Sequence, residues 1–308
     1  MMDEFVIETK KLTKKYGHET AIHDVDLHVR KGRIYGLLGR NGAGKTTIMK
    51  AVLGLIPIDS GEVKVFGERI EERKERIYPR IGAMIETPGF YPNLTGTENL
   101  EIFAKLRGVP TPDAVENALR LVGLPVRDKK LFGAYSLGMK QRLGIANAVF
   151  HDPELLILDE PTNGLDPIGI AGIRDHLKKL VVEREKTILI SSHILSEITL
   201  LADDIGIIDR GVLLEEAPLS ELTKRDRRYI ELRVSDVPKT VLILERDFGM
   251  KGYSVQDDCT LHLFDAVEDI GAVHRALVLE DVAVYESRFC SHTLEDYFKS
   301  ITGGEGIA

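Results

Sequence analysis

The chain of 308 residues is 43% hydrophobic and 29% charged, proportions that are typical of a globular protein. It is longer than one compact core usually holds, so the length predicts two domains. A formal net charge of −8 argues against nucleic acid as a main partner.

The cysteines and the apolar runs of the chain indicate the cellular compartment in which we expect the protein. Cys259 and Cys290 lie far apart without the spacing of a metal site, which favours a reducing cytosol. The first ten residues lack the pattern of a signal peptide. No window reaches the roughly 18 consecutive apolar residues that span a bilayer. We therefore expect a cytoplasmic protein that would need another chain to cross a membrane.

Short runs with strand-like alternation fill the first part of the chain. Residues 5–37 predict an antiparallel sheet, with turns at Tyr16-Gly17 and Lys31-Gly32. The run from Ile34 to Leu38 predicts a strand, and residues 47–55 have the apolar spacing of a helix. A glycine-rich loop therefore lies between a strand and a helix.

This loop fits the phosphate-binding pattern G-x-x-x-x-G-K-[ST]. Its glycines let backbone N–H groups turn toward a phosphate, Lys45 adds a positive charge, and the Thr46 hydroxyl can bind Mg²⁺. We therefore predict that the loop holds a nucleoside triphosphate together with Mg²⁺. The residues predicted to contact the nucleotide are Gly39, Arg40, Asn41, Gly42, Ala43, Gly44, Lys45, Thr46 and Thr47.

Beyond the loop, the apolar spacing separates strands from a helical insertion. A strand is expected near residues 60–67, and a mostly helical subdomain over about residues 88–150. Residues 155–158 and 187–190 are short apolar runs, joined by a helix-like segment over residues 168–182. This order predicts a βαβ unit in a buried parallel sheet.

Two carboxylates follow the first of these apolar runs. Asp159 stands at the predicted end of the strand, where it can hold Mg²⁺ directly or through water. Glu160 can point at the γ-phosphate and orient or deprotonate the attacking water. We therefore predict Asp159 as a metal ligand and Glu160 as a catalytic residue.

The character of the sequence changes near Arg225. The remainder predicts a β-α-β-β-α-β order, which is the ferredoxin-like pattern. We therefore expect a nucleotide-binding domain over residues 1–224 and a small accessory α+β domain over residues 225–308. The predicted strands of the second domain are 229–234, 252–256, 260–264 and 282–288, and its predicted helices are 238–247, 267–279 and 293–301.

A further motif runs from Tyr135 to Arg142. It resembles the LSGGQ motif of the ATP-binding subunits of ABC transporters: Ser136 and Gly138 match, whereas Leu137 and Met139 replace the more common glycine and glutamine. Its serine and the N–H groups that open the next helix can meet a γ-phosphate. With the other motifs in the family's order, the chain resembles these subunits over about residues 5–220.

The resemblance implies a fold, a nucleotide and further site residues. The fold is the ABC type of P-loop NTPase, with an antiparallel β subdomain and a helical subdomain, and the nucleotide is ATP. Tyr16 would stack on adenine, and Ser136 and Gly138 would bind ATP. Asp166 would lie in the loop 163–166 that communicates across a dimer, and His193 would bond the γ-phosphate as a catalytic residue.

The resemblance also implies partners. In this family the LSGGQ-like loop of one subunit closes on the phosphate loop of another. A single copy of each motif therefore implies a homodimer with two composite sites. Such a dimer would power a separate membrane permease, which would hold the protein at the inner face of the membrane.

One departure from the family pattern narrows the resemblance. Where the family has glutamine, this chain has Glu86, followed by a Pro-Gly-Phe-Tyr-Pro-Asn-Leu-Thr run over residues 88–95. This run and the chain's ending at 293–298 resemble the bacitracin-export and lantibiotic-immunity ATPases. Glu86 would lie near Mg²⁺ and the γ-phosphate, as a metal-binding and catalytic residue. The resemblance implies an ATPase that drives the export or removal of antimicrobial peptides.

Two alternatives remain open at this point. The cargo could instead be a drug or a polysaccharide, because the absent membrane subunit largely selects it. A non-transport ABC ATPase, such as a DNA-repair or ribosome-associated clamp, needs tandem cassettes or long arms between its nucleotide motifs. The chain has one cassette, and the stretch between Lys45 and Asp159 is short for such arms, so both features disfavour this alternative.

Overall fold

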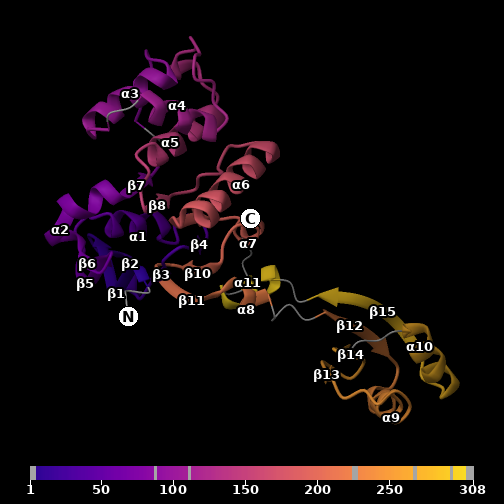
Figure 1. Cartoon of the computed structure of the whole chain (residues 1–308). Coiled ribbons are helices and arrows are strands. Elements are labelled where there is room, and N and C mark those ends of the chain that lie inside the picture. The colour runs from indigo at the N-terminus through magenta and orange to yellow at the C-terminus, as the bar shows by residue number, and fades with distance from the viewer. Residues whose placement is uncertain are drawn as a thin grey trace. The chain divides into compact units, whose positions relative to one another are not determined.

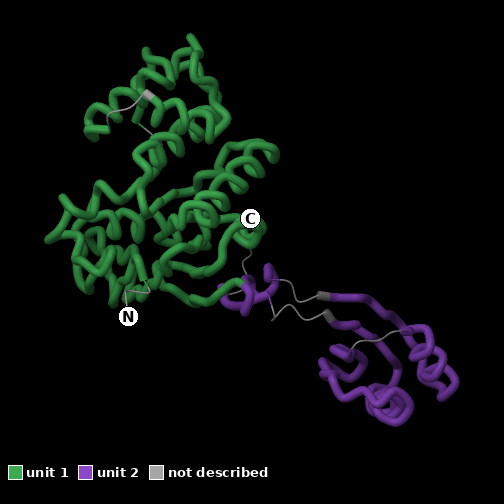
Figure 2. The backbone as a smooth tube through the Cα atoms, in the orientation of Figure 1, with its two compact units in different colours: residues 1–219, 307–308 green, residues 220–306 purple. Residues whose placement is uncertain are grey.

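The computed structural model describes residues 5–86, 89–109, 112–223, 228–265, 269–291 and 294–302. The chain forms two compact units, one of residues 1–219 and 307–308 and the other of residues 220–306 (Figure 2). Among the described helices, none combines the length and the apolar character needed to cross a membrane.

An antiparallel sheet opens the first unit. β1 lies between β2 and β5, β3 also pairs with β1, and β6 pairs with the far side of β5. A turn with Gly17 at φ 61° reverses the chain between β1 and β2. The antiparallel sheet predicted near the N-terminus is therefore present. Its strands are β1 (Phe5–Tyr16), β2 (Glu19–Val25), β3 (His28–Arg30), β5 (Ser60–Val65) and β6 (Glu68–Arg69).

A second sheet carries the functional loops. Its order is β11-β10-β4-β9-β8-β7, and all pairs are parallel except β10 with β11. The prediction that residues 34–37 join the antiparallel sheet was wrong, because every residue of β4 is buried and such a strand fits only a covered parallel sheet. The strands are β4 (Ile34–Leu38), β7 (Ile81–Met84), β8 (Leu155–Leu158), β9 (Thr187–Ser192), β10 (Asp204–Asp209) and β11 (Val212–Pro218).

Helices cover this sheet and form the predicted insertion between β7 and β8. The insertion stands apart from the sheets in Figure 1 and consists of α3 (Gly96–Leu106), α4 (Pro112–Leu121), a 3-10 turn (Phe132–Ala134) and α5 (Leu137–Val149). A capping box between Thr95 and Glu98 begins α3, and the Ser136 side chain caps α5. The other helices are α1 (Lys45–Val52), α2 (Ile70–Ile77) with the 3-10 turn Tyr78–Arg80, α6 (Pro167–Arg184) and α7 (Leu195–Thr199).

The second unit has the predicted ferredoxin-like topology. Its sheet order is β13-β14-β12-β15, with every pair antiparallel. Leu232, Leu261 and Val273 are fully buried between this sheet and its helices. The elements are α8 (Leu219–Thr223), β12 (Arg228–Val234), α9 (Val237–Phe248), β13 (Tyr253–Val255), β14 (Thr260–Leu263), α10 (Ile270–Leu279), β15 (Val284–Ser291) and α11 (Leu294–Ile301).

Candidate functional site

The glycine-rich loop turns tightly between β4 and α1. Gly42 and Gly44 have φ of 81° and 108°, values that side chains rarely adopt. A Cβ on Gly44 would also lie 2.9 Å from the Ala21 carbonyl oxygen, and one on Gly39 would lie 2.4 Å from that of Ile208. Glycine is therefore required because the loop lies directly against β2 and β10.

Lys45 lies inside this loop and is almost fully buried. Its ammonium donates to the carbonyl oxygens of Gly39, at 2.6 Å, and Arg40, at 3.1 Å. It also lies 3.1 Å from Oε1 of Glu160. The lysine charge is thus fixed at the centre of the loop, beside the predicted catalytic carboxylate.

A hydroxyl and a carboxylate meet where β4, β8 and β9 end side by side. Thr46 Oγ1 donates to Asp159 Oδ2 at 2.8 Å. Ser191 Oγ donates to Asp159 Oδ1 at 2.6 Å and accepts from the Glu160 N–H at 2.9 Å. Ser191 therefore fixes the direction of Asp159 and the backbone of Glu160 at the same time.

Besides Ser191, three side chains contact Glu160. Besides its ion pair with Lys45, its Oε2 lies 2.7 Å from Nδ1 of His193. Gln141 on α5 donates to the Glu160 carbonyl oxygen at 2.8 Å. The backbone of Glu160 is left-handed, with φ of 48°, a strained state that surrounding contacts must maintain. The side chain is therefore presented in one direction, next to the phosphate loop.

Lys45, Thr46 and Glu160 line a pocket of about 410 Å³. The phosphate loop forms one wall, and the start of β2 and the turn after β10 complete it. Its lining residues are Glu19, Thr20, Ala21, Arg40, Asn41, Gly42, Gly44, Lys45, Thr46, Thr47, Glu160 and Arg210.

Three other predicted residues group at the starts of two helices. Ser136 caps α5 by accepting from the Met139 N–H at 3.3 Å, and Asp166 caps α6 by accepting from the Gly169 N–H at 2.8 Å. A Cβ on Gly138 would lie 3.2 Å from the Leu165 side chain, so the two segments lie against each other. They do not line the 410 Å³ pocket of their own chain.

Tyr16 and Glu86 also lie outside the lining of this pocket. Tyr16 ends β1 with half of its surface exposed, and the Lys14 ammonium stands 5.3 Å from the centre of its ring. Glu86 follows β7 in a left-handed conformation, with φ of 57°. Its carboxylate accepts from Lys50 on α1 at 2.5 Å, and this hydrogen bond raises the pKa of Lys50.

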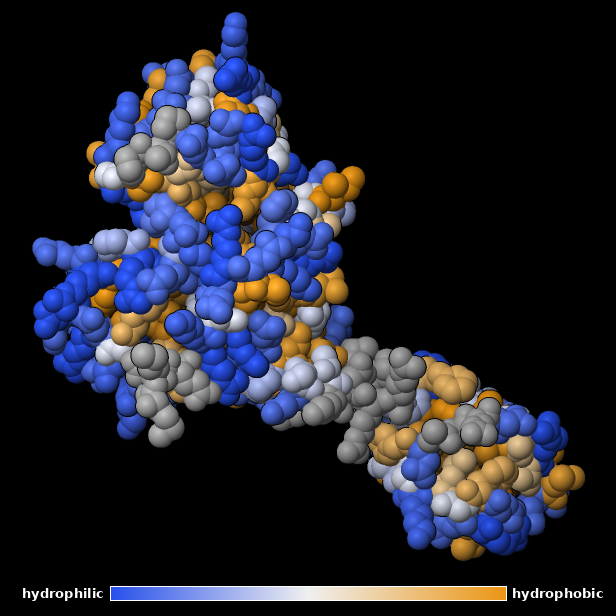
Figure 3. Space-filling model, in the orientation of Figure 1, coloured by the Kyte–Doolittle hydropathy of each residue, from blue (hydrophilic) through white to orange (hydrophobic). Residues whose placement is uncertain are grey.

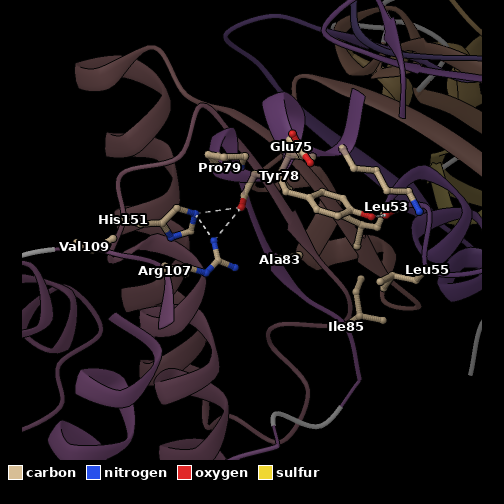
Figure 4. A pocket seen from close by; sticks show the side chains of 12 residues that line it. Leu53, Leu55, Glu75, Tyr78, Pro79, Ala83, Ile85, Arg107, Val109 and His151 are labelled. Atoms are coloured by element: carbon tan, nitrogen blue, oxygen red, sulfur yellow. Dashed lines mark hydrogen bonds between the residues drawn. The ribbon is translucent and has the colours of Figure 1, made fainter. Parts of the chain in front are cut away.

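A larger groove of about 910 Å³ lies between the strand β7 and the helical insertion (Figure 4). Arg107 and His151 meet in its wall, 2.8 Å apart, and both reach the Ile81 carbonyl oxygen. Burial, followed by the charge of Arg107, lowers the pKa of His151 to about 4. Ile85 also lines this groove, directly before Glu86. The groove is therefore continuous with the loop that carries Glu86.

Sequence reasoning missed four residues at these sites: Ser191, Gln141, Lys50 and Arg210. Ser191 stands at the end of a predicted parallel strand, where side chains reach a site, so its position was a usable signal. Lys50 and Thr46 are one helical turn apart on α1, which places both toward the loop. Gln141 lies in the motif from Tyr135 to Arg142, but its contact with Glu160 depends on the fold. Arg210 carried no local signal, because its place at the pocket depends on distant segments.

The comparisons with known proteins agree on one family. Residues 22–163 match the model described as ABC transporter. A bacitracin transport ATP-binding protein, BcrA, from Enterococcus faecalis is 51% identical over 308 residues, which cover 100% of both chains. A protein of the same name from Bacillus licheniformis is 48% identical over 98% of this chain and 99% of that relative.

A solved structure shares the fold of the nucleotide-binding part. The dimeric structure of a bacterial ABC transporter cassette superposes with a TM-score of 0.65 and 25% sequence identity. The match covers 69% of this chain and 98% of the cassette.

Proposed function

The chain belongs to the ATP-binding proteins of ABC transporters, and on this basis we propose that it hydrolyses ATP at the 410 Å³ pocket, with Mg²⁺, to drive a peptide-exporting permease. As a member of this family it is an ATPase that binds ATP. The roles of single residues, the metal, the partners and the cargo are the proposed part.

The observation that carries the proposal is the convergence of two pairs on the phosphate loop, Thr46 with Asp159 and Lys45 with Glu160. A hydroxyl and a carboxylate 2.8 Å apart are the oxygen ligands that Mg²⁺ takes, with phosphates and water completing its shell. Bound there, the ion would neutralise charge on the β- and γ-phosphates. Thr46 and Asp159 therefore fit this metal.

Glu160 is the proposed catalytic base. Its carboxylate is fixed between Lys45 and His193, so one oxygen faces the loop where the γ-phosphate would lie. From there it can orient and deprotonate water for attack. The contact with Nδ1 of His193 keeps the carboxylate in this direction. Gln141 ties the Glu160 backbone to the LSGGQ-like helix α5.

A homodimer with composite sites is the proposed assembly. Ser136 and Gly138 do not line the pocket of their own chain, although the motif suits a γ-phosphate. A second copy could bring these residues to the pocket, as the resemblance implies. The solved relative with the same cassette fold is described as dimeric, which supports this assembly.

The groove supports a proposal for the partner, and the relatives support one for the cargo. We propose that an apolar segment of the permease lies in the 910 Å³ groove, because Leu53, Leu55 and Ile85 supply apolar walls. An occupant there would contact the strand that leads to Glu86. Both full-length relatives are named for bacitracin transport, which supports a peptide antibiotic of this kind as the cargo.

Two substitutions test the assignment. Lys45→Ala should weaken ATP binding, because it removes the buried charge at the loop. Glu160→Gln should bind ATP, hydrolyse it roughly 10²–10⁴-fold more slowly, and accumulate as an ATP-held dimer in size-exclusion chromatography. Glu154→Gln, which changes an exposed carboxylate directly before β8, is the control and should keep wild-type turnover. Equal turnover of wild type and Glu160→Gln would refute the assignment.

A further inference from the structure

The turn between β10 and β11 is joined to the phosphate loop. It consists of Arg210 and Gly211, and the Gly211 N–H donates to the Ala43 carbonyl oxygen at 2.9 Å. On its other side the Gly211 carbonyl oxygen accepts from the His23 N–H at 2.8 Å. The turn is therefore fixed between the loop and β2, and Arg210 is placed at the rim of the 410 Å³ pocket.

Arginine is an unexpected residue at this point of the turn. Arg210 and Gly211 both have positive φ, 47° and 81°, as in the two-residue hairpin turns that favour Asn-Gly. Asparagine would adopt the first of these conformations with less strain than arginine. A strained residue beside a binding pocket is a reason to look for a function in its side chain.

The Arg210 guanidinium is available for a ligand. Its side chain is 82% exposed, and its carboxylate contact among the described residues is Asp209 at 3.9 Å. Lys45, by contrast, lies against Glu160, which offsets its charge. Arg210 therefore adds an exposed positive charge to a pocket whose central lysine is already paired. Guanidinium groups recognise phosphate through paired N–H donors.

We propose that Arg210 is a further nucleotide-contact residue, whose guanidinium binds the phosphate chain of ATP from the β10–β11 turn. The inference rests on the proposed function, that this pocket binds ATP. Arg210 acts in binding and takes no part in water activation, which stays with Glu160. Because the turn is tied to Ala43, the guanidinium approaches the phosphates from a fixed position.

The test uses the full chain with Arg210→Asn, which separates binding from folding. The variant should unfold at a higher temperature than wild type, because asparagine adopts the left-handed conformation of residue 210 with less strain than arginine. The same variant should bind ATP about fivefold more weakly, the effect of one exposed charge contact. A purely structural role for Arg210 would not give these opposite changes.

Inorganic tripolyphosphate locates the contact. In competition against a fluorescent ATP analogue, its affinity should fall by the same factor in Arg210→Asn, because it contains the phosphates alone. Arg210→Lys should recover part of both affinities. Arg120→Ala, which removes an exposed charge from α4 outside this pocket, should leave both unchanged.

The results separate this inference from the proposed function. If wild type binds ATP, Lys45→Ala does not and Arg210→Asn binds as tightly as wild type, the inference is wrong and the function stands. Weaker ATP binding with unchanged tripolyphosphate binding would also overturn it. Wild type that binds no ATP would refute the proposed function itself.

Discussion

Single side chains at the strand ends determine the geometry of the candidate site. Ser191 directs Asp159 and the Glu160 backbone, so the proposed metal ligand and the proposed base are held by one buried side chain. The motif-bearing residues could be predicted because each motif is local in the chain. The contacts that Ser191 and Gln141 make with these residues could not be predicted, because their partners lie 32 and 19 residues away and meet them only in the folded protein.

Glu86 is the residue at which this chain departs from the family pattern. It pairs with Lys50 on the helix that follows the phosphate loop, and Ile85 beside it lines the 910 Å³ groove. The residue thus connects α1 to the proposed permease contact. Its carboxylate is largely exposed, so the ion pair with Lys50 contributes at most about 1 kcal/mol.

We expect Glu86→Gln to change coupling more than nucleotide binding. A glutamine can still accept from Lys50 but brings no charge, so ATP affinity should stay within about threefold and ATPase activity should largely remain. Peptide resistance of cells that carry the cognate permease should fall at matched expression. Glu62→Gln, which neutralises a partly buried carboxylate paired with Arg69 outside the 410 Å³ pocket, is the control. Full resistance of the Glu86 variant would show that this carboxylate has no role in coupling.

At the scale of elements, the sequence predicted the parallel sheet and the helical insertion well. Continuous apolar runs such as β8 and β9 are diagnostic of covered strands. The assignment of residues 34–37 to the antiparallel sheet failed. The strand-like alternation of apolar and polar residues ahead of the phosphate loop does not show at which strand the chain passes into the second sheet. The 910 Å³ groove could not be predicted either, since β7, α2 and the insertion form it together.

His151, in the wall of the groove, makes the free energy of unfolding depend on pH. The folded-state pKa of His151 is about 4, below its usual 6.5, because burial and Arg107 disfavour the charged ring. As the pH falls below 6.5, the imidazole of His151 is protonated in the unfolded chain, whereas in the folded chain it stays neutral until about pH 4. His151 therefore lowers the free energy of unfolding as the pH falls through this window.

Replacing His151 by glutamine should remove this part of the pH dependence. We expect wild type to lose more thermal stability than His151→Gln between pH 7 and pH 5, measured by circular dichroism melting. The carboxylates that also titrate are common to both proteins, so they cancel in the comparison. Parallel pH profiles for wild type and His151→Gln would contradict the explanation.

At the scale of the whole molecule, the proposed nucleotide site lies within one of the two units. Every lining residue of the 410 Å³ pocket lies between positions 19 and 210, whereas the second unit begins at residue 220. The second unit has its own buried core and leaves Leu279, Tyr285 and Phe289 exposed, and Figure 3 shows apolar patches on its surface. Exposed apolar side chains in a separately folded unit suit a role in assembly or regulation. We propose that this unit is accessory to ATP binding.

A chain that ends at residue 224 tests this division. It should still bind ATP, with an affinity within a few-fold of the full chain, because the phosphate loop, Asp159 and Glu160 all remain on the intact sheet. Dimer formation or its regulation should be the property that weakens, measured by size-exclusion chromatography with ATP in a Glu160→Gln background. Lys45→Ala in the same shortened chain is the control for specific binding. A shortened chain that is folded by circular dichroism yet binds no ATP would place part of the nucleotide site in the second unit, since folding alone could not then account for the loss.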